Sequence, residues 1–138
     1  MAVCLSKGLG APVGSLLVGT ADTVTEARVW RKRMGGGMRQ VGILAAAGLH
    51  ALEHHVERLA EDHAHARLLA EACGVDPAGV DSNIVVVPRS DAAAFVAAAR
   101  QEGVLAAPVG PTAVRLVTHL DVSRDDAEKA AAVLARLA

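Results

Sequence analysis

Residues 3–19 read VCLSKGLGAPVGSLLVG, and this stretch limits how the start of the chain can fold. Three glycines and a proline fall within residues 8–14, which excludes a helix and predicts a tight loop. Two short apolar runs flank the loop, at residues 3–5 and 15–19, and both are typical of buried strands. The sequence therefore predicts a strand, a loop and a second strand, with Lys7 where the first strand ends.

Two helices are predicted next. Thr20 or Asp22 can cap a helix that ends in a basic cluster at residues 28–33, before three consecutive glycines. A long amphipathic helix is expected over residues 38–74, because apolar residues recur at steps of three and four. Its apolar face comprises Leu49, Leu52, Val56, Leu59, Ala66 and Ala70. Its polar face comprises His50, His54, Glu57, Glu61 and His65.

The segment 80–138 predicts a small two-layer unit of helices and strands. The expected elements, in order, are strand 84–87, helix 92–100, strand 104–106, strand 114–118 and helix 124–137. Ser123 is the expected N-cap of the last helix. This order is typical of the α+β class.

Composition excludes several functions. Fourteen basic and 15 acidic residues give a net charge of −1, so nothing draws the chain to nucleic acid or to an anionic membrane. Cys4 and Cys73 have no metal-binding spacing and are predicted to be free thiols, which favours the cytoplasm. The longest apolar stretch, residues 41–52, is shorter than the roughly 20 residues of a membrane span.

Lys7 is the candidate nucleophile. A lysine at a strand end beside a glycine-rich loop can reach a carbonyl group and form a Schiff base, although many such lysines are only solvated surface charges. The glycine spacing in residues 8–14 does not match the dinucleotide-binding fingerprint, and the loop precedes a strand rather than a helix.

Four stretches, in the same order, resemble the low-specificity threonine aldolases of the beta-eliminating lyase and threonine aldolase family. They are residues 3–15, residues 28–40, residues 45–63 and residues 114–122. The family consists of lyases that depend on pyridoxal phosphate and have the aspartate-aminotransferase fold. The resemblance therefore implies the C-terminal portion of an α/β fold of that type: residues 1–37 as a remnant of the cofactor-binding large domain, residues 38–74 as a connecting helix and residues 80–138 as a small α/β domain.

The resemblance also implies roles for individual residues. Lys7 would hold pyridoxal phosphate as a Schiff base, and Arg39 would approach the cofactor phosphate of a neighbouring subunit in a dimer or tetramer. Ser6 would contact the phosphate or only cap the loop. Arg115 would bind the carboxylate of a hydroxy amino acid, L-threonine or L-allo-threonine, which is cleaved to glycine and acetaldehyde. The local pattern around Arg115 alone is equally compatible with an arginine that faces solvent.

Two alternatives remain open. His50, Glu53 and His54 spell the H-x-x-E-H pattern of inverted zinc peptidases, but no third ligand is evident. The second alternative is a non-catalytic fragment or a module that needs a partner chain. Family members carry, upstream of the lysine, an aspartate for the pyridine nitrogen, a histidine stacked on the ring and the main phosphate loop. This sequence contains none of these, so we expect a truncated chain that is inactive alone.

Overall fold

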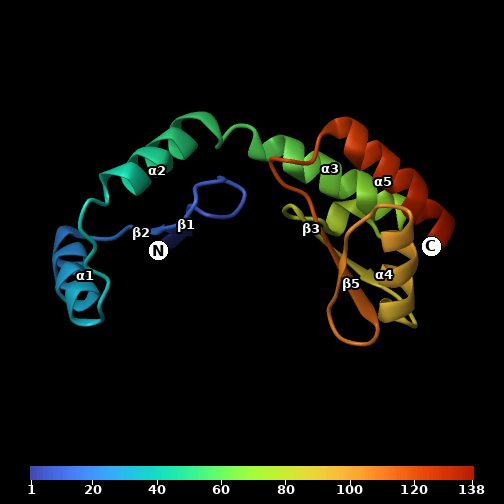
Figure 1. The fold of residues 1–138 in the computed structure, drawn as a ribbon, viewed down its shortest axis with the longest axis horizontal. Helices are drawn as coiled ribbons and strands as arrows, with labels where there is room; N and C mark the ends of the chain where they lie inside the picture. Colours follow the sequence, from blue (N-terminus) through green and yellow to red (C-terminus); the bar gives the residue numbers. More distant parts are fainter. The chain divides into compact units, whose positions relative to one another are not determined.

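The computed structural model describes residues 1–138 and divides them into two compact units, Met1–Glu57 and Arg58–Ala138 (Figure 1). The elements of the first unit are β1 (Ala2–Cys4), β2 (Ser15–Leu17), α1 (Ala21–Arg33) and α2 (Gly42–His54). The elements of the second unit are α3 (Leu59–Ala72), a 3-10 turn (Pro77–Gly79), β3 (Ile84–Pro88), α4 (Ala92–Gln101), β4 (Ala107–Pro108), β5 (Ala113–Val117) and α5 (Arg124–Leu137).

The first unit begins with the predicted strand, loop and strand. β1 and β2 pair antiparallel, with Cys4 opposite Ser15, and the connecting loop spans residues 5–14. The prediction that both strands are buried is wrong, because every residue of β2 is exposed and no residue of β1 is fully buried. The two strands pair only with each other, so the outer edge of β2 has no partner strand.

The helix α1 begins where one of the two predicted caps places it. The side-chain oxygen of Thr20 accepts a hydrogen bond from the backbone N–H of Thr23, which makes Thr20 the N-cap rather than Asp22. The last turn carries the basic residues 31–33, and Gly35 follows with a φ of 82°, a left-handed conformation that glycine adopts without strain.

The single helix expected over residues 38–74 is two helices, α2 and α3, interrupted at residues 55–58. No glycine or proline lies at the interruption. Instead, His55 hydrogen-bonds the loop of the first unit, and Arg58 forms an ion pair with Asp62 inside the second unit. The apolar face predicted for this stretch is correct for Ala66 and Ala70, which are buried, and wrong for Leu49, Leu52 and Val56, which are exposed.

The second unit has two layers. Its three strands pair antiparallel in the order β3–β5–β4, with Val86 opposite Arg115 and Ala107 on the other side of Arg115. One face of the sheet packs against the helices, and its buried core side chains include Val85, Val87, Val114 and Leu116 of the sheet with Leu69, Phe95 and Leu134 of the helices. The α+β arrangement predicted for this region is therefore present, with α3 as part of the helical layer.

The prediction of a strand at residues 104–106 is wrong, because the strand in this region, β4, comprises only Ala107 and Pro108. Gly103 adopts a φ of 83° at the end of α4, and the N–H of Val104 donates to the carbonyl of Ala99. Val104 is thus part of the helix C-terminal cap and is not available to a strand.

The last helix follows the prediction closely. Ser123 caps α5 in a capping box, in which its hydroxyl accepts from the N–H of Asp126 while the carboxylate of Asp126 accepts from the N–H of Ser123. None of the helices combines the length and the hydropathy that crossing a bilayer requires.

Candidate active site

The loop that carries Lys7 is held by its own backbone. Leu5 N–H donates to Gly14 carbonyl and Ala11 N–H to Leu5 carbonyl, each at 2.9 Å, and Gly10 N–H donates to Lys7 carbonyl at 2.8 Å. The last of these bonds closes a turn over residues 7–10. Gly10 has a φ of 74°, which explains the need for glycine at the end of that turn.

The same loop divides its side chains between the inside and the outside. Leu5, Leu9 and Ala11 are buried, whereas Ser6 and Lys7 are exposed. None of the ion pairs in the chain includes Lys7, so its amine is not committed to a carboxylate. The structure therefore presents the predicted nucleophile as a free amine on a hydrogen-bonded turn.

Cys4, three residues before Lys7, carries a thiol. Cys4 Sγ and Ser6 Oγ are 3.4 Å apart. The pKa of the Cys4 thiol is lowered from its ordinary value, chiefly by hydrogen bonding to the Ser6 side chain and then to the Ser6 backbone, with a further contribution from the charge of Lys7. Ser6 thus contacts Cys4, a contact that the sequence did not reveal.

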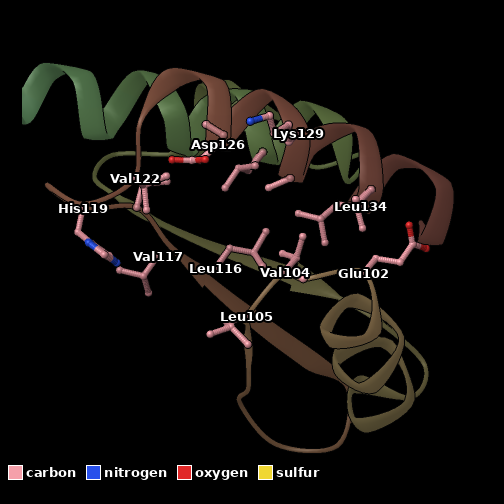
Figure 2. Close-up of a pocket in the computed structure, with 16 residues that line it drawn as sticks. Glu102, Val104, Leu105, Leu116, Val117, His119, Val122, Asp126, Lys129 and Leu134 are labelled. Carbon is pink, nitrogen blue, oxygen red and sulfur yellow. The ribbon is translucent and has the colours of Figure 1, made fainter.

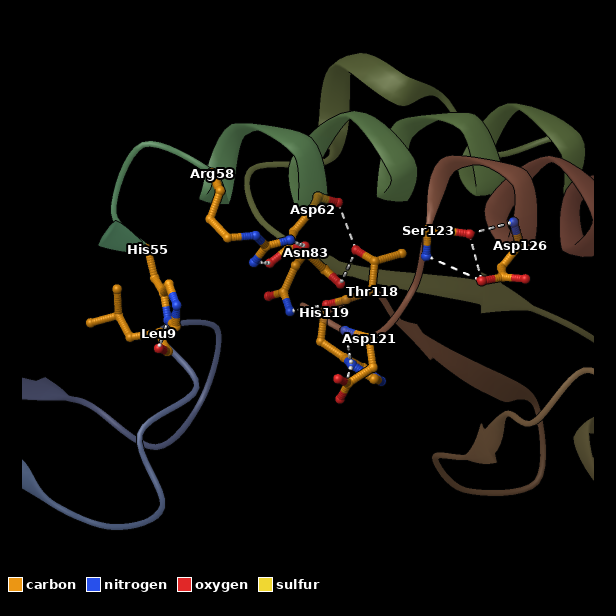
Figure 3. Close-up of polar contacts among 10 residues, drawn as sticks. All are labelled: Leu9, His55, Arg58, Asp62, Asn83, Thr118, His119, Asp121, Ser123 and Asp126. Carbon is orange, nitrogen blue, oxygen red and sulfur yellow. Dashed lines mark hydrogen bonds and ion pairs between the residues drawn. The ribbon is translucent and has the colours of Figure 1, made fainter. Parts of the chain in front are cut away.

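His55 is a second residue that sequence reasoning missed at this loop. Its Nδ1 atom lies 2.6 Å from the carbonyl oxygen of Leu9, 46 residues earlier in the chain (Figure 3). A carbonyl only accepts hydrogen bonds, so Nδ1 carries the hydrogen and donates it. The only sequence signal was a histidine pair at the end of an apolar helix, which does not identify a partner.

Helix α2 also lies against the lysine loop. A Cβ atom built on Gly48 would be 3.1 Å from Leu5 Cδ1, and Ala51, three residues on, is 1% exposed. The absence of a side chain at Gly48 therefore allows the close approach of Leu5.

Arg39 belongs to the same unit as Lys7 and lies in the turn that precedes α2. It is exposed and takes part in none of the ion pairs. The next residue, Gln40, has a φ of 49°, the only left-handed conformation of a residue other than glycine in the chain. The guanidinium is therefore available to an anion.

Arg115 belongs to the second unit, at the middle of the central strand β5. It lies on the sheet face that the helices do not cover, where its cross-strand neighbours are Val86 and Ala107. Ile84, Val86 and Val117 are exposed on the same face. Arg115 is thus an unpaired cation on an open, largely aliphatic sheet surface.

Buried polar groups hold the end of β5 in place. Thr118 and Asp62 are the two buried polar residues of the chain, and Thr118 Oγ1 donates to the Asp62 carbonyl at 2.6 Å. Figure 3 shows Thr118 also joined to Asn83, whose side-chain amide donates to the Thr118 carbonyl at 2.6 Å. Arg58 binds both carboxylate oxygens of Asp62, and these hydrogen bonds raise the pKa of the guanidinium above its ordinary value. Sequence reasoning did not identify this network, because Asp62, Asn83 and Thr118 lie far apart in the chain.

The histidines of the zinc-peptidase pattern are close together but have no further ligand. The ring centroids of His50 and His54 are 4.4 Å apart. No group of three or more His, Cys, Asp or Glu side chains is arranged to hold a metal ion. The third ligand that the pattern would need is therefore not supplied by these residues.

A pocket of about 480 Å³ lies within the second unit, between the start of α5, the end of β5 and the segment after α4 (Figure 2). Its lining is mostly aliphatic and includes Val104, Leu116, Val122 and Leu134. Arg115 is not part of this lining, so the pocket and the predicted substrate arginine are separate features.

Comparisons with known proteins give one consistent result. The family profile described as beta-eliminating lyase matches residues 1–92. The low specificity L-threonine aldolase of Escherichia coli (strain K12) is 51% identical over 137 residues, covering 94% of this chain and 40% of that protein. The probable low-specificity L-threonine aldolase 2 of Arabidopsis thaliana is 42% identical, covering 93% of this chain and 39% of that protein. The chain thus spans about 40% of the length of these curated relatives.

Proposed function

The chain belongs to the beta-eliminating lyase family, and on that premise we propose that its residues serve a pyridoxal-phosphate-dependent lyase that cleaves L-threonine or L-allo-threonine to glycine and acetaldehyde. The observation that carries the proposal is the free, exposed amine of Lys7 on a hydrogen-bonded glycine turn, in a chain that is 51% identical to a protein named as a low specificity L-threonine aldolase.

The first unit offers groups that suit the aldehyde and the phosphate of such a cofactor. An aldehyde needs an uncommitted amine, and Lys7 has no ion-pair partner. A phosphate needs cations and hydrogen-bond donors, which Arg39 and Ser6 can supply. When bound, pyridoxal phosphate supplies an electron-withdrawing ring that weakens the bonds at the Cα atom of an attached amino acid. Lys7 would hold the cofactor and, once released from it, would move protons at the reacting carbon.

Arg115 is proposed to bind the carboxylate of the substrate. A guanidinium offers two parallel N–H donors to a carboxylate, so it fixes the orientation of the amino acid as well as its position. The exposed side chains on the same face, Ile84, Val86 and Val117, are aliphatic and offer Arg115 no carboxylate. Arg115 is therefore free to bind a carboxylate, as the substrate role requires.

The larger architecture is part of the same proposal. We infer an aspartate-aminotransferase-like fold, in which residues 1–37 belong to the cofactor-binding large domain and residues 80–138 form the small domain. A homo-oligomer is proposed because the resemblance implies that Arg39 would reach the phosphate of a neighbouring subunit. The cytoplasmic location predicted from the two free cysteines stays a prediction.

The proposal is tested by covalent trapping. The purified chain is mixed with pyridoxal phosphate, reduced with borohydride, digested and analysed by mass spectrometry, and acetaldehyde released from L-threonine is measured in parallel. We expect the pyridoxyl group on Lys7, and no label at that site in Lys7→Arg, which keeps the charge but not the reactive amine. Labelling spread evenly over Lys7, Lys32 and Lys129 would contradict a dedicated site.

A further inference from the structure

The contact between His55 and Leu9 links the end of α2 to the turn that carries Lys7. The Nδ1–O distance of 2.6 Å is short for a hydrogen bond from nitrogen, and the pair is partly buried (Figure 3). Leu9 is itself buried, and among the backbone hydrogen bonds outside helices and strands none ends on its carbonyl. His55 is therefore the donor that satisfies this partly buried acceptor.

Leu9 belongs to the same turn as Lys7. The bond from Gly10 N–H to Lys7 carbonyl closes residues 7–10, so Leu9 is the third residue of a four-residue turn that Lys7 begins. The orientation of the Leu9 carbonyl is set by the peptide plane that it shares with Gly10 N–H. A donor that fixes this carbonyl consequently fixes the peptide group that bonds back to Lys7.

The other end of the contact is also fixed. His55 follows α2 directly, and its backbone N–H donates to the carbonyl of Ala51 at 2.9 Å. Its ring stands edge-on to that of His50, with centroids 5.3 Å apart. The close approach of α2 to the loop at Gly48 and Leu5 brings the two partners within reach.

We propose that His55 is a positioning residue for Lys7: by donating Nδ1–H to the Leu9 carbonyl, it holds the turn in the conformation that presents the Lys7 amine. The inference rests on the proposed function only in that Lys7 is the residue that takes the cofactor. The four carbons of a lysine side chain are flexible. If the backbone also moved, the amine would be displaced further from its target, and a fixed backbone removes this part of the motion. Both the Nδ1–H tautomer and the imidazolium can donate this bond.

Three variants separate the hydrogen bond from the bulk of the ring. His55→Leu removes the donor and keeps an apolar side chain of similar size. His55→Asn places an amide nitrogen near the position of Nδ1 and can still donate. Glu57→Leu makes a comparable change at an exposed neighbour and serves as the control.

The first measurement needs no cofactor. The Gly10 and Ala11 amides donate hydrogen bonds to the carbonyls of Lys7 and Leu5, respectively. The rate of hydrogen exchange at these two amides therefore reports the stability of the loop. We expect exchange roughly fivefold faster in His55→Leu, from the loss of one hydrogen bond, with most of the protection retained in His55→Asn and all of it in Glu57→Leu. Equal protection in His55→Leu and in the parent chain overturns the inference.

The second measurement is the rate at which Lys7 takes up pyridoxal phosphate, trapped with borohydride. We expect it to be roughly fivefold slower in His55→Leu and restored in His55→Asn. A rate that does not change while exchange does would also overturn the positioning role. If Lys7 of the parent chain takes up no pyridoxal phosphate, the proposed function fails, and the exchange result alone decides whether His55 holds the turn.

Folding of the variants does not limit the test. If circular dichroism shows that His55→Leu is unfolded, nitrogen NMR of the parent chain identifies which ring nitrogen of His55 carries the hydrogen. A hydrogen on Nδ1 that is protected from exchange supports the contact. Rapid exchange at Nδ1, or a neutral ring with its hydrogen on Nε2, overturns it.

Discussion

The hydroxyl group of Thr118 donates a hydrogen bond of 2.6 Å to the backbone carbonyl of Asp62, 56 residues earlier in the chain. Thr118 is 1% exposed and lies directly after β5, and Asp62 lies in the first turn of α3. The bond therefore ties the central strand, which carries Arg115, to the helical layer. Asn83 reinforces the same strand end, because its backbone carbonyl accepts from Thr118 N–H at 3.0 Å.

Thr118→Val should lower the free energy of unfolding by about 1–2 kcal/mol, because a buried hydrogen bond is lost without a change in side-chain volume. Thr118→Ser keeps the hydroxyl and should lose less. Urea denaturation followed by circular dichroism measures both values. If the valine variant proved as stable as the parent chain, the bond would contribute nothing to the fold.

Ser123→Ala should destabilise the second unit by about 1 kcal/mol, because α5 loses its N-cap. Thermal unfolding of the variant measures the loss. Ser123→Asp, which can still cap the helix, is the matched control and should recover most of the stability.

Asp126 makes the stability of α5 depend on pH. Hydrogen bonds from the Ser123 side chain and backbone hold the pKa of the Asp126 carboxyl below its ordinary value of 3.8. A carboxyl with a lowered pKa in the folded state stabilises the fold above pH 3.8, and this contribution disappears as the pH falls through the lowered pKa. The free energy of unfolding, measured between neutral and acid pH, should therefore fall less steeply in Asp126→Asn than in the parent chain.

The two cysteines should react at different pH values. Burial raises the pKa of the Cys73 thiol, whereas hydrogen bonding to Ser6 lowers that of Cys4. Because the thiolate is the reactive form, iodoacetamide should modify Cys4 first and at lower pH. Ser6→Ala should move the midpoint for Cys4 upward and leave Cys73 unchanged. Peptide mass spectrometry over a pH series follows both sites, and faster labelling of Cys73 would contradict the assignment.

Arg115→Leu separates binding from folding. The side chain is exposed and has no ion-pair partner, so the free energy of unfolding should change by no more than about 0.5 kcal/mol. In a complete enzyme that contains these residues, the kcat/KM for L-threonine should fall by roughly 10- to 100-fold, the effect of one lost hydrogen-bonded charge. Arg115→Lys should recover only part of this, because an ammonium group does not bind a carboxylate through two parallel bonds. Unchanged kinetics in the leucine variant would assign Arg115 to solvent.

Helix ends marked by local chemistry could be predicted from the sequence. Thr20 and Ser123 are N-caps in the structure, and Gly74 follows α3 with a φ of 72°. These signals involve residues within one turn of each other, which is the range over which a sequence pattern is informative.

The interruption of the long helix could not be predicted in this way. His55 and Arg58 are both compatible with a continuous helix, so their local propensity gives no sign of an interruption. The partner of His55 is Leu9, which lies 46 residues away, so only the folded chain reveals the contact. The position of Lys7 on its turn was predictable from the glycines, whereas the donor that satisfies the turn was not.

Burial of the strands was the other property that the pattern misjudged. Leu16 and Leu17 are 40% and 48% exposed, although their run of apolar residues is typical of a core strand. An apolar run indicates that a strand can be buried, but burial itself depends on what packs against it.

Gly48 has a consequence for anyone who would engineer this chain. By helix propensity alone, alanine would stabilise the middle of α2 by about 1 kcal/mol, so Gly48 looks like an obvious position to improve. The added methyl group would meet Leu5 Cδ1 at 3.1 Å. The Leu5 side chain, two residues before Lys7, would have to shift to admit this methyl group, which opposes the gain in the helix. Gly48 therefore leaves room for the loop that carries Lys7, and it is not simply a weak point of the helix.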